Sequence, residues 1–145
     1  MIYRCLAFGF VCLSIFKAAA VEPTRLSFDD LLLRPIGPYG IEIGPKAKSM
    51  QGQIVQLRGF MVKSEDHKSG QFYLSPMPIQ LNEHADGLAN DLPASAVLVK
   101  FDPSQSSWMA SHQPGPILLE GILHIGRHED TQGNVSWFQL LLPIY

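Results

Sequence analysis

Cysteine is nearly absent from this sequence of 145 residues, which contains only Cys5 and Cys12. Both lie among the first twenty residues, so the remainder of the chain contains none. Without cysteine, that remainder can form no disulfide, hold no metal through thiolates and use no cysteine nucleophile. Its stability has to come from a hydrophobic core, and about 125 residues suffice for one ordinary domain but not for two.

The chain also lacks an excess of positive charge. It has 11 Lys and Arg against 13 Asp and Glu, and without Arg4 and Lys17 nine basic residues face thirteen acidic ones, a net charge of −4. Because nucleic-acid binding normally requires a basic face, we expect no nucleic-acid partner. After residue 20 no apolar run approaches the roughly 20 residues that cross a bilayer, so we expect no transmembrane segment there.

The first twenty residues have the three parts of a secretory signal peptide. Arg4 supplies positive charge, residues 5–16 (CLAFGFVCLSIF) form an uncharged apolar run, and Ala18-Ala19-Ala20 offers a small-x-small cleavage site. We therefore expect residues 1–20 to be a cleaved signal and the product to be periplasmic or secreted. The alternative is a buried N-terminal helix, which would need a polar face that this run lacks.

Residues 21–51 are expected to form an N-terminal arm. Ser27 followed three positions later by Asp30 resembles a capping box and predicts one short helix, which Pro35 ends. The following stretch IGPYGIEIGP is punctuated by glycine and proline and predicts an ordered loop.

Residues 52–145 alternate as strands do. In GQIVQLRGFMV, Val55, Leu57, Gly59 and Met61 share one face, while Gln56 and Arg58 lie on the other. Four more strands are expected at 71–75, 96–101, 117–125 and 135–142. Five short strands, with a glycine inside the first and the fourth, are typical of a small barrel. We predict a mainly β fold, a five-stranded barrel like that of oligonucleotide/oligosaccharide-binding (OB) domains with one short N-terminal helix.

Four segments together resemble a family of uncharacterised exported bacterial proteins with an OB-like barrel domain. They are GQIVQLRGFMV, FYLSPMPI, LPASAVLVKF and GILHIG, followed by an aromatic-rich last strand, and the likeness covers roughly Gly52 to Leu142. Many members of that family carry a cysteine and a histidine shortly after the second strand. The matching region here, Met77 to His84, has no cysteine, so the resemblance implies the fold and lends no metal role.

Two groups of histidines and carboxylates could in principle hold a metal ion. One comprises Glu83, His84, Asp86 and Asp91, and the other His124, His128, Glu129 and Asp130. Neither spacing matches a known ligand signature, so we expect no metal and no cofactor. No G-x-S-x-G motif for a hydrolase occurs either. A metal-handling or metal-dependent envelope protein is the alternative function.

Three side chains of the predicted barrel suggest a binding face. Arg58, Tyr73 and Trp137 are all expected to point outward, on strands that we expect to be neighbours. OB barrels bind ligands through aromatic and polar side chains on one open face. The alternative is that the arm or the long loops cover the aromatic residues. We predict an exported, non-catalytic binding or accessory protein whose partner is a protein, a peptide or a glycan.

Overall fold

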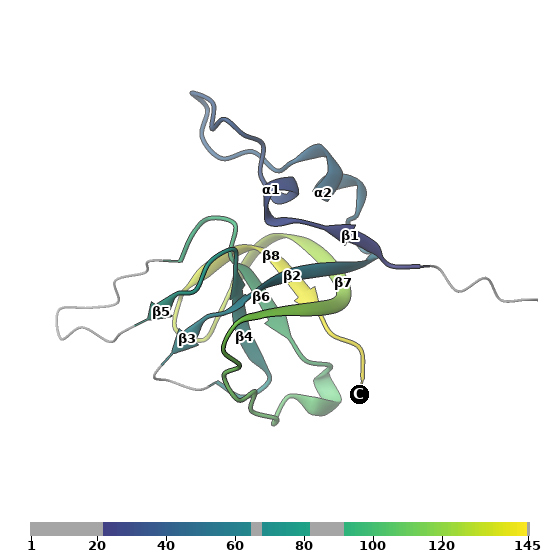
Figure 1. Cartoon of the computed structure of the whole chain (residues 1–145), viewed down its shortest axis with the longest axis vertical. Coiled ribbons are helices and arrows are strands. Elements are labelled where there is room, and N and C mark those ends of the chain that lie inside the picture. Colours follow the sequence, from purple (N-terminus) through teal and green to yellow (C-terminus); the bar gives the residue numbers. More distant parts are fainter. Residues whose placement is uncertain (1–21, 65–67, 82–91, 145) are drawn as a thin grey trace, which may run out of the picture.

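The computed structural model describes residues 22–64, 68–81 and 92–144 (Figure 1). The fold is mainly β, as predicted. The strands of its main sheet are β1 (Thr24–Leu26), β2 (Ile54–Met61), β4 (Gln71–Ser75), β6 (Val97–Lys100), β7 (Pro116–Glu129) and β8 (Val135–Leu141). A separate parallel pair joins β3 (Lys63–Ser64) to β5 (Gln80–Leu81). None of the helices in the described ranges is long and apolar enough to span a bilayer.

Five strands of the main sheet pair in a closed series that begins and ends at β2. β2 pairs with β4, β4 with β6, β6 with β8, β8 with β7, and β7 again with β2. Only the β6–β8 pair in this series is parallel. β1 runs parallel to the first half of β2, and β4 pairs with its last residues.

The predicted alternation along the strands is confirmed. Val55, Leu57 and Met61 are buried on β2, whereas Arg58 is exposed. The expected inward residues Leu123 of β7 and Phe138 and Leu140 of β8 are 0% exposed, and Leu142, directly after β8, is 4% exposed. β7 is longer than expected because it continues beyond Ile125, after an irregularity between Ile125 and His128.

Gly59 and Gly121 provide the close approaches expected of a glycine on the inner face of a strand. A Cβ atom at Gly59 would lie 2.6 Å from the ring of Phe28 and 2.8 Å from the carbonyl oxygen of Ser75. At Gly121 it would lie 2.6 Å from the carbonyl oxygen of Leu141. Only a residue without a side chain lets these neighbours pack so closely.

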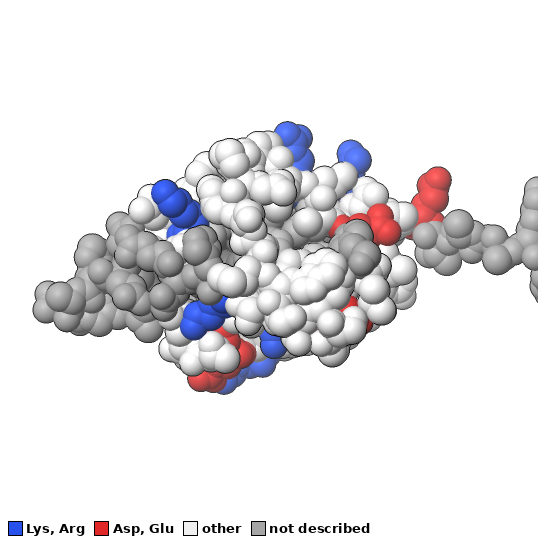
Figure 2. Space-filling view, turned by 90° about the horizontal axis from the view of Figure 1, so that it is seen from below, with Lys and Arg blue, Asp and Glu red and all other residues white. Residues whose placement is uncertain are grey.

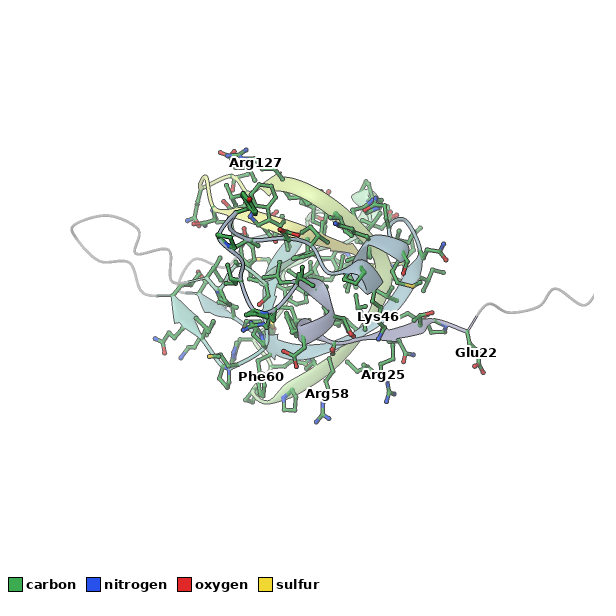
Figure 3. The ribbon with its side chains drawn as sticks, turned by 90° about the horizontal axis from the view of Figure 1, so that it is seen from above. Glu22, Arg25, Lys46, Arg58, Phe60 and Arg127 are labelled. Carbon is green, nitrogen blue, oxygen red and sulfur yellow. The ribbon has the colours of Figure 1, made fainter. Side chains whose placement is uncertain are left out.

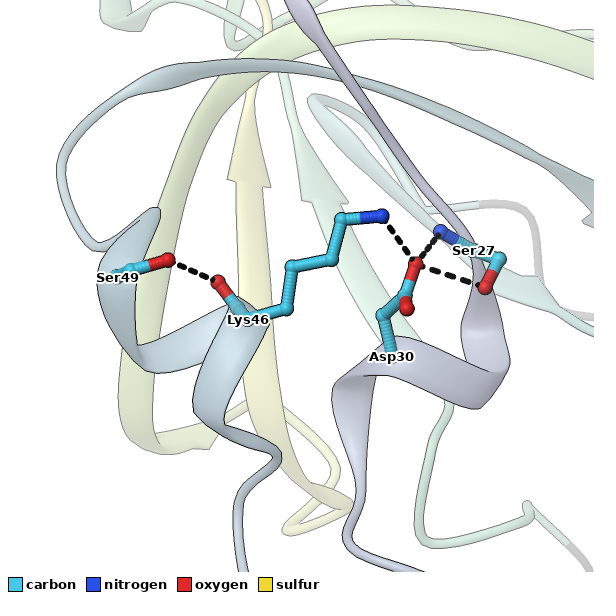
Figure 4. A network of polar contacts seen from close by, with 4 residues as sticks. All are labelled: Ser27, Asp30, Lys46 and Ser49. Carbon is cyan, nitrogen blue, oxygen red and sulfur yellow. Dashed lines mark hydrogen bonds and ion pairs between the residues drawn. The ribbon is translucent and has the colours of Figure 1, made fainter.

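The arm contributes to the core as well as covering it. Its helices are α1 (Phe28–Leu31), which begins after Ser27 as predicted, and α2 (Pro45–Ser49), which the sequence did not suggest. The backbone N–H and the hydroxyl of Ser27 both donate to Oδ2 of Asp30 at 2.9 Å, and Lys46 of α2 donates to the same oxygen at 2.8 Å (Figure 4). This carboxylate therefore ties the two helices together, and Phe28, Leu31 and Ala47 pack into the main core.

A second, smaller apolar cluster lies apart from the main core. It comprises Val62, Tyr73, Ala96 and Leu98, with Ile79, Leu81 and Leu92 packed against it. Because Tyr73 and Leu98 face each other across β4 and β6, this cluster covers the opposite side of those two strands. The segment between β6 and β7 begins with the 3-10 helix η1 (Pro103–Gln105) and is otherwise irregular, as its prolines and serines predicted.

Candidate functional site

The three predicted binding residues do not lie together. Arg58 is exposed on β2 and points away from the body of the protein beside Arg25 (Figure 3). Its neighbour across the sheet is Leu118 of β7, which is itself 50% exposed. The outward direction predicted for Arg58 is confirmed, and the surface around it is an open strand face.

Tyr73 corrects one expectation. It lies on the outer side of β4 as predicted, yet it is only 8% exposed because the second apolar cluster covers its ring. Its hydroxyl donates to Oδ2 of Asp130 at 3.2 Å and approaches the carbonyl oxygen of Asn134 at 3.5 Å. Burial and the adjacent Asp130 carboxylate together raise the pKa of this phenol well above its ordinary value. Tyr73 thus links β4 to the turn between β7 and β8.

Trp137 points outward as predicted, but its strand does not have the predicted neighbours. It is 41% exposed on β8. β8, however, pairs with β6 and β7 and not with β2 or β4, so the three strands are not mutual neighbours. Trp137 lies opposite the irregular part of β7 that contains Arg127, and Figure 3 places Arg127 and Arg58 on opposite sides of the molecule. Arg58, Tyr73 and Trp137 therefore do not form one face.

The two groups of histidines and carboxylates that could in principle hold a metal differ in whether the structure describes them. Glu83, His84, Asp86 and Asp91 lie outside the described residues. Within the described part of the chain, no three His, Cys, Asp or Glu side chains converge as a metal site requires. Burial lowers the pKa of His128 and is partly opposed by a hydrogen bond with the backbone of His124. Electrostatic interactions with His124 and Lys100 lower this pKa further. Its imidazole is therefore neutral at physiological pH.

Asp130 organises the turn between β7 and β8. Its Oδ1 accepts the backbone N–H groups of Gln132 at 2.8 Å and Asn134 at 2.9 Å, and its Oδ2 accepts the side-chain amide of Asn134 at 2.8 Å and the hydroxyl of Tyr73. Burial alone would raise the pKa of Asp130, but these hydrogen bonds outweigh burial and lower it. The carboxylate is therefore ionised and its four contacts hold the turn in place.

Three adjoining hollows surround His112, and we call them together the His112 cleft. The innermost, of about 50 Å³, lies against Tyr73 and the Asp130 turn. The other two, of about 300 and 460 Å³, lie between the β3–β5 pair and the irregular segment before β7. His112 borders all three. Its walls also include Met61, Val62, Lys63, Ser64, Lys68 and Leu81.

The lining of the His112 cleft combines apolar surface with groups that donate and accept hydrogen bonds. Met61, Val62 and Leu81 supply apolar contacts, and Lys63 and Lys68 supply positive charge. Such a mixture is typical of a site that binds and orients a ligand. Lys68 donates to the hydroxyl of Thr131 at 3.2 Å, so the Asp130 turn also holds one of the cations.

The described residues of the cleft do not form an assembled hydrolytic centre. Ser64, His112 and Asp130 border its innermost hollow, but among the described residues no hydrogen bond joins any two of them, and the Asp130 carboxylate already accepts four. A serine nucleophile requires a base within hydrogen-bond reach that is itself oriented by a third group. The described residues can contact a ligand, and among them Ser64 has no hydrogen-bonded base.

Sequence reasoning missed His112 and the pairing of Tyr73 with Asp130. His112 occupies an irregular segment rich in serine and proline, where no period marks one residue above another. Asp130 and Asn134 did carry a readable signal, because Asp four positions before Asn in a Gly-containing turn is typical of a side chain that caps its own loop.

The described surface shows no basic stripe in the view of Figure 2, where Lys, Arg, Asp and Glu side chains are interspersed around a broad uncharged area. This mixed pattern agrees with the small net acidic charge of the sequence.

No family model matches the sequence, and no curated protein matches it either. Among solved structures, the chain is similar to a DUF3299 family protein from Pseudomonas aeruginosa. The two share 13% sequence identity over 83% of this chain and 92% of the other, with a TM-score of 0.48. A likeness of this degree assigns neither a family nor a function to the chain.

Proposed function

We propose that this protein is an exported, non-catalytic binding protein and that it binds its ligand in the His112 cleft. Export rests on the signal-like residues 1–20, and it would place the product in the periplasm or outside the cell. The absence of a hydrogen-bonded nucleophile and base among the described residues of the cleft supports a binding role over a catalytic one.

We further propose that β2, β4, β6, β7 and β8 are the five strands of an OB-type barrel. The cycle of pairings supports this, since the five strands pair in the order β2, β4, β6, β8, β7 and again β2. A five-stranded barrel with one parallel pair between its third and fifth strands has this connectivity. β1 and the two helices of the arm then lie outside the cycle and add to its core.

The position of the cleft is the observation that carries the proposal. OB barrels bind their ligands on the second and third strands, between the loop that follows the first strand and the loop that precedes the fifth. The innermost hollow is bordered by Ser64 and Lys68 from the first of those loops, by Tyr73 from the second strand, and by Asp130 and Asn134 from the other loop. A partly open groove with apolar and hydrogen-bonding walls suits a peptide or a glycan chain.

Capture of the ligand tests this proposal with a matched pair of variants. The exported product is isolated, immobilised and exposed to envelope extract, and the captured molecules are identified by mass spectrometry. His112→Ala should reduce capture of the specific ligand at least about tenfold, because His112 borders all three hollows. His124→Ala is the same change on β7, outside the cleft, and should leave capture unchanged. Equal capture by both variants would place the binding site elsewhere.

The mass of the exported product tests the compartment. Cleavage at the expected site gives a chain that begins at or within two residues of Val21 and contains no cysteine. Intact-mass measurement on envelope material distinguishes this product from the full chain. A mass that still includes Cys5 and Cys12 would contradict export by this signal.

A further inference from the structure

Residues 33–41 form a projecting hairpin, which we call the finger, at the side of the arm that lies farthest from the C-terminus in Figure 1. Its base is held by a hydrogen bond from the Leu33 N–H to the Glu42 carbonyl oxygen at 2.8 Å and by a bridge between Leu32 and Ile43. Its tip turns between Gly37 and Gly40, where the Gly40 N–H donates to the Gly37 carbonyl oxygen at 3.1 Å. Leu31 and Leu32 at the base belong to the main core, so the finger has a fixed root.

The finger exposes an unusual amount of apolar surface. Four large hydrophobic side chains within nine residues are extensively exposed: Leu33 (45%), Ile36 (61%), Tyr39 (93%) and Ile41 (47%). Single exposed apolar residues are ordinary on a protein surface, but a contiguous group marks a place where the protein contacts something apolar. The rigid root makes the group available for contact without any need to unfold the arm.

We propose that the finger inserts its tip into the surface of a lipid bilayer. No acidic residue occurs from residue 31 to residue 41, and the only charge in that stretch is Arg34. Ile36 and Tyr39 are then the deepest groups. A tyrosine has an apolar ring and a polar hydroxyl and is enriched at the level of lipid headgroups, and an arginine can keep its charge among the headgroups while its stem lies deeper.

The shape of the finger favours a bilayer over a protein partner. A stable protein interface buries about 800 Å² on each side and surrounds its apolar centre with a polar rim. A hairpin of nine residues offers a narrow convex tip, which needs a matching groove in any protein that binds it. A bilayer needs no such groove, because its lipids move aside for a small apolar insertion.

The charged residues around the finger determine how strongly its binding to a bilayer depends on anionic lipid. Lys46 is paired with Asp30, and the acidic residue at the base of the finger is Glu42. Arg34 is therefore the charge most directly available to anionic headgroups. We expect insertion to depend mainly on the apolar tip and to respond to anionic lipid by about the contribution of one cation.

Flotation with vesicles tests the proposal. The exported product is mixed with vesicles of phosphatidylethanolamine and phosphatidylglycerol, and the fraction that floats with lipid gives a partition coefficient. Ile36→Ser and Tyr39→Ser should each lower this coefficient about tenfold, because each removes a large apolar group from the bilayer. Arg34→Gln should lower it about fivefold with these vesicles and leave it unchanged with purely zwitterionic phosphatidylcholine vesicles.

Ile144→Ser is the matched control. Ile144 is 67% exposed, close to the value for Ile36, and lies beside the carboxyl end that Figure 1 marks on the side away from the finger. All variants are compared in the same form of the chain, so any contribution of its N-terminal residues is common to them. No binding to vesicles, or equal loss in Ile36→Ser and Ile144→Ser, would overturn the proposal. The His112 cleft and its ligand are independent of either result.

Discussion

Asp130→Asn should destabilise the fold at neutral pH. In acid, most of this difference in unfolding free energy from the wild-type protein should disappear. The change keeps an oxygen that can accept the backbone N–H groups of Gln132 and Asn134, but it replaces the oxygen that now accepts from Tyr73 and from the Asn134 amide. Each hydrogen bond to a charged group contributes about 1.5 to 3 kcal/mol when buried. Because Asp130 is partly exposed, we expect a loss of about 2 to 3 kcal/mol in the free energy of unfolding.

The sign of the pH dependence follows from the lowered pKa of Asp130. A carboxyl whose pKa is lower in the folded state stabilises the protein above its ordinary pKa of 3.8, and this contribution disappears as the pH falls through the folded value. The difference in unfolding free energy between the wild-type protein and Asp130→Asn should therefore be constant near neutral pH. It should shrink below about pH 4.

Urea denaturation at a series of pH values measures this difference directly. Tyr73→Phe is the companion variant, since it removes one hydrogen bond to the same oxygen and retains the ring in its apolar cluster. It should cost about 1 kcal/mol at neutral pH. A difference between wild type and Asp130→Asn that stays the same from neutral pH into acid would refute the assignment of Asp130 as an ionised organiser of the turn.

Three further predictions concern the core and the surface. Leu57→Ala should lower the free energy of unfolding, measured by urea denaturation, by about 2 to 5 kcal/mol. Gln56→Ala, on the opposite face of β2, should change it by no more than about 0.5 kcal/mol. Equal losses would contradict the assignment of Leu57 to the inner face. Gly59→Ala should cost about 1 to 3 kcal/mol because its methyl group would press on backbone and ring atoms. Gly37→Ala, where nothing lies within 4 Å, should be neutral or slightly stabilising, and a similar result at both sites would contradict the close packing. Trp137→Ala should leave capture of the cleft ligand unchanged; a loss of capture without a loss of stability would show that the ligand contacts Trp137 and would contradict binding in the His112 cleft alone.

The strands were the most predictable part of this fold. Successive side chains of a strand point to opposite faces. In a strand with one buried face, apolar and polar residues therefore alternate, and the apolar positions identify the inner face. The alternation around Leu57 therefore identified β2 and its inner face without knowledge of any neighbour. β7 and β8 were found in the same way. β1 was missed because three residues are too few to show a period.

The same pattern could not reveal what covers the outer face. Alternation placed Tyr73 on the side of β4 away from the main core, and that was correct. Whether the ring is exposed depends on Ile79, Leu81 and Leu92, which pack against its cluster from segments that show no period. Facing outward from a sheet and being exposed to solvent are separate properties, and only the first of them is local.

Strand order was the other limit. Alternation identifies each strand by itself, but five strands can pair in several orders, and the order is decided by contacts between distant parts of the chain. The expectation that β8 adjoins β2 or β4 had no local support, and β6 and β7 in fact flank β8. The predicted binding face failed at this step even though the outward directions of Arg58 and Trp137 were both correct.

The His112 cleft shows why sites are harder to predict than the folds that carry them. Tyr73, His112 and Asp130 come from a strand, an irregular segment and a turn, and each had an ordinary structural explanation in its own surroundings. Asp130 alone is a turn-capping carboxylate, and Tyr73 alone is an aromatic residue on a strand. The hydrogen bond between them exists only because the pairings of β4 with β6, β6 with β8 and β8 with β7 bring the turn over β4. A site assembled in this way becomes visible when the strand order is known, so the order of the strands was the missing information for the fold and for the site alike.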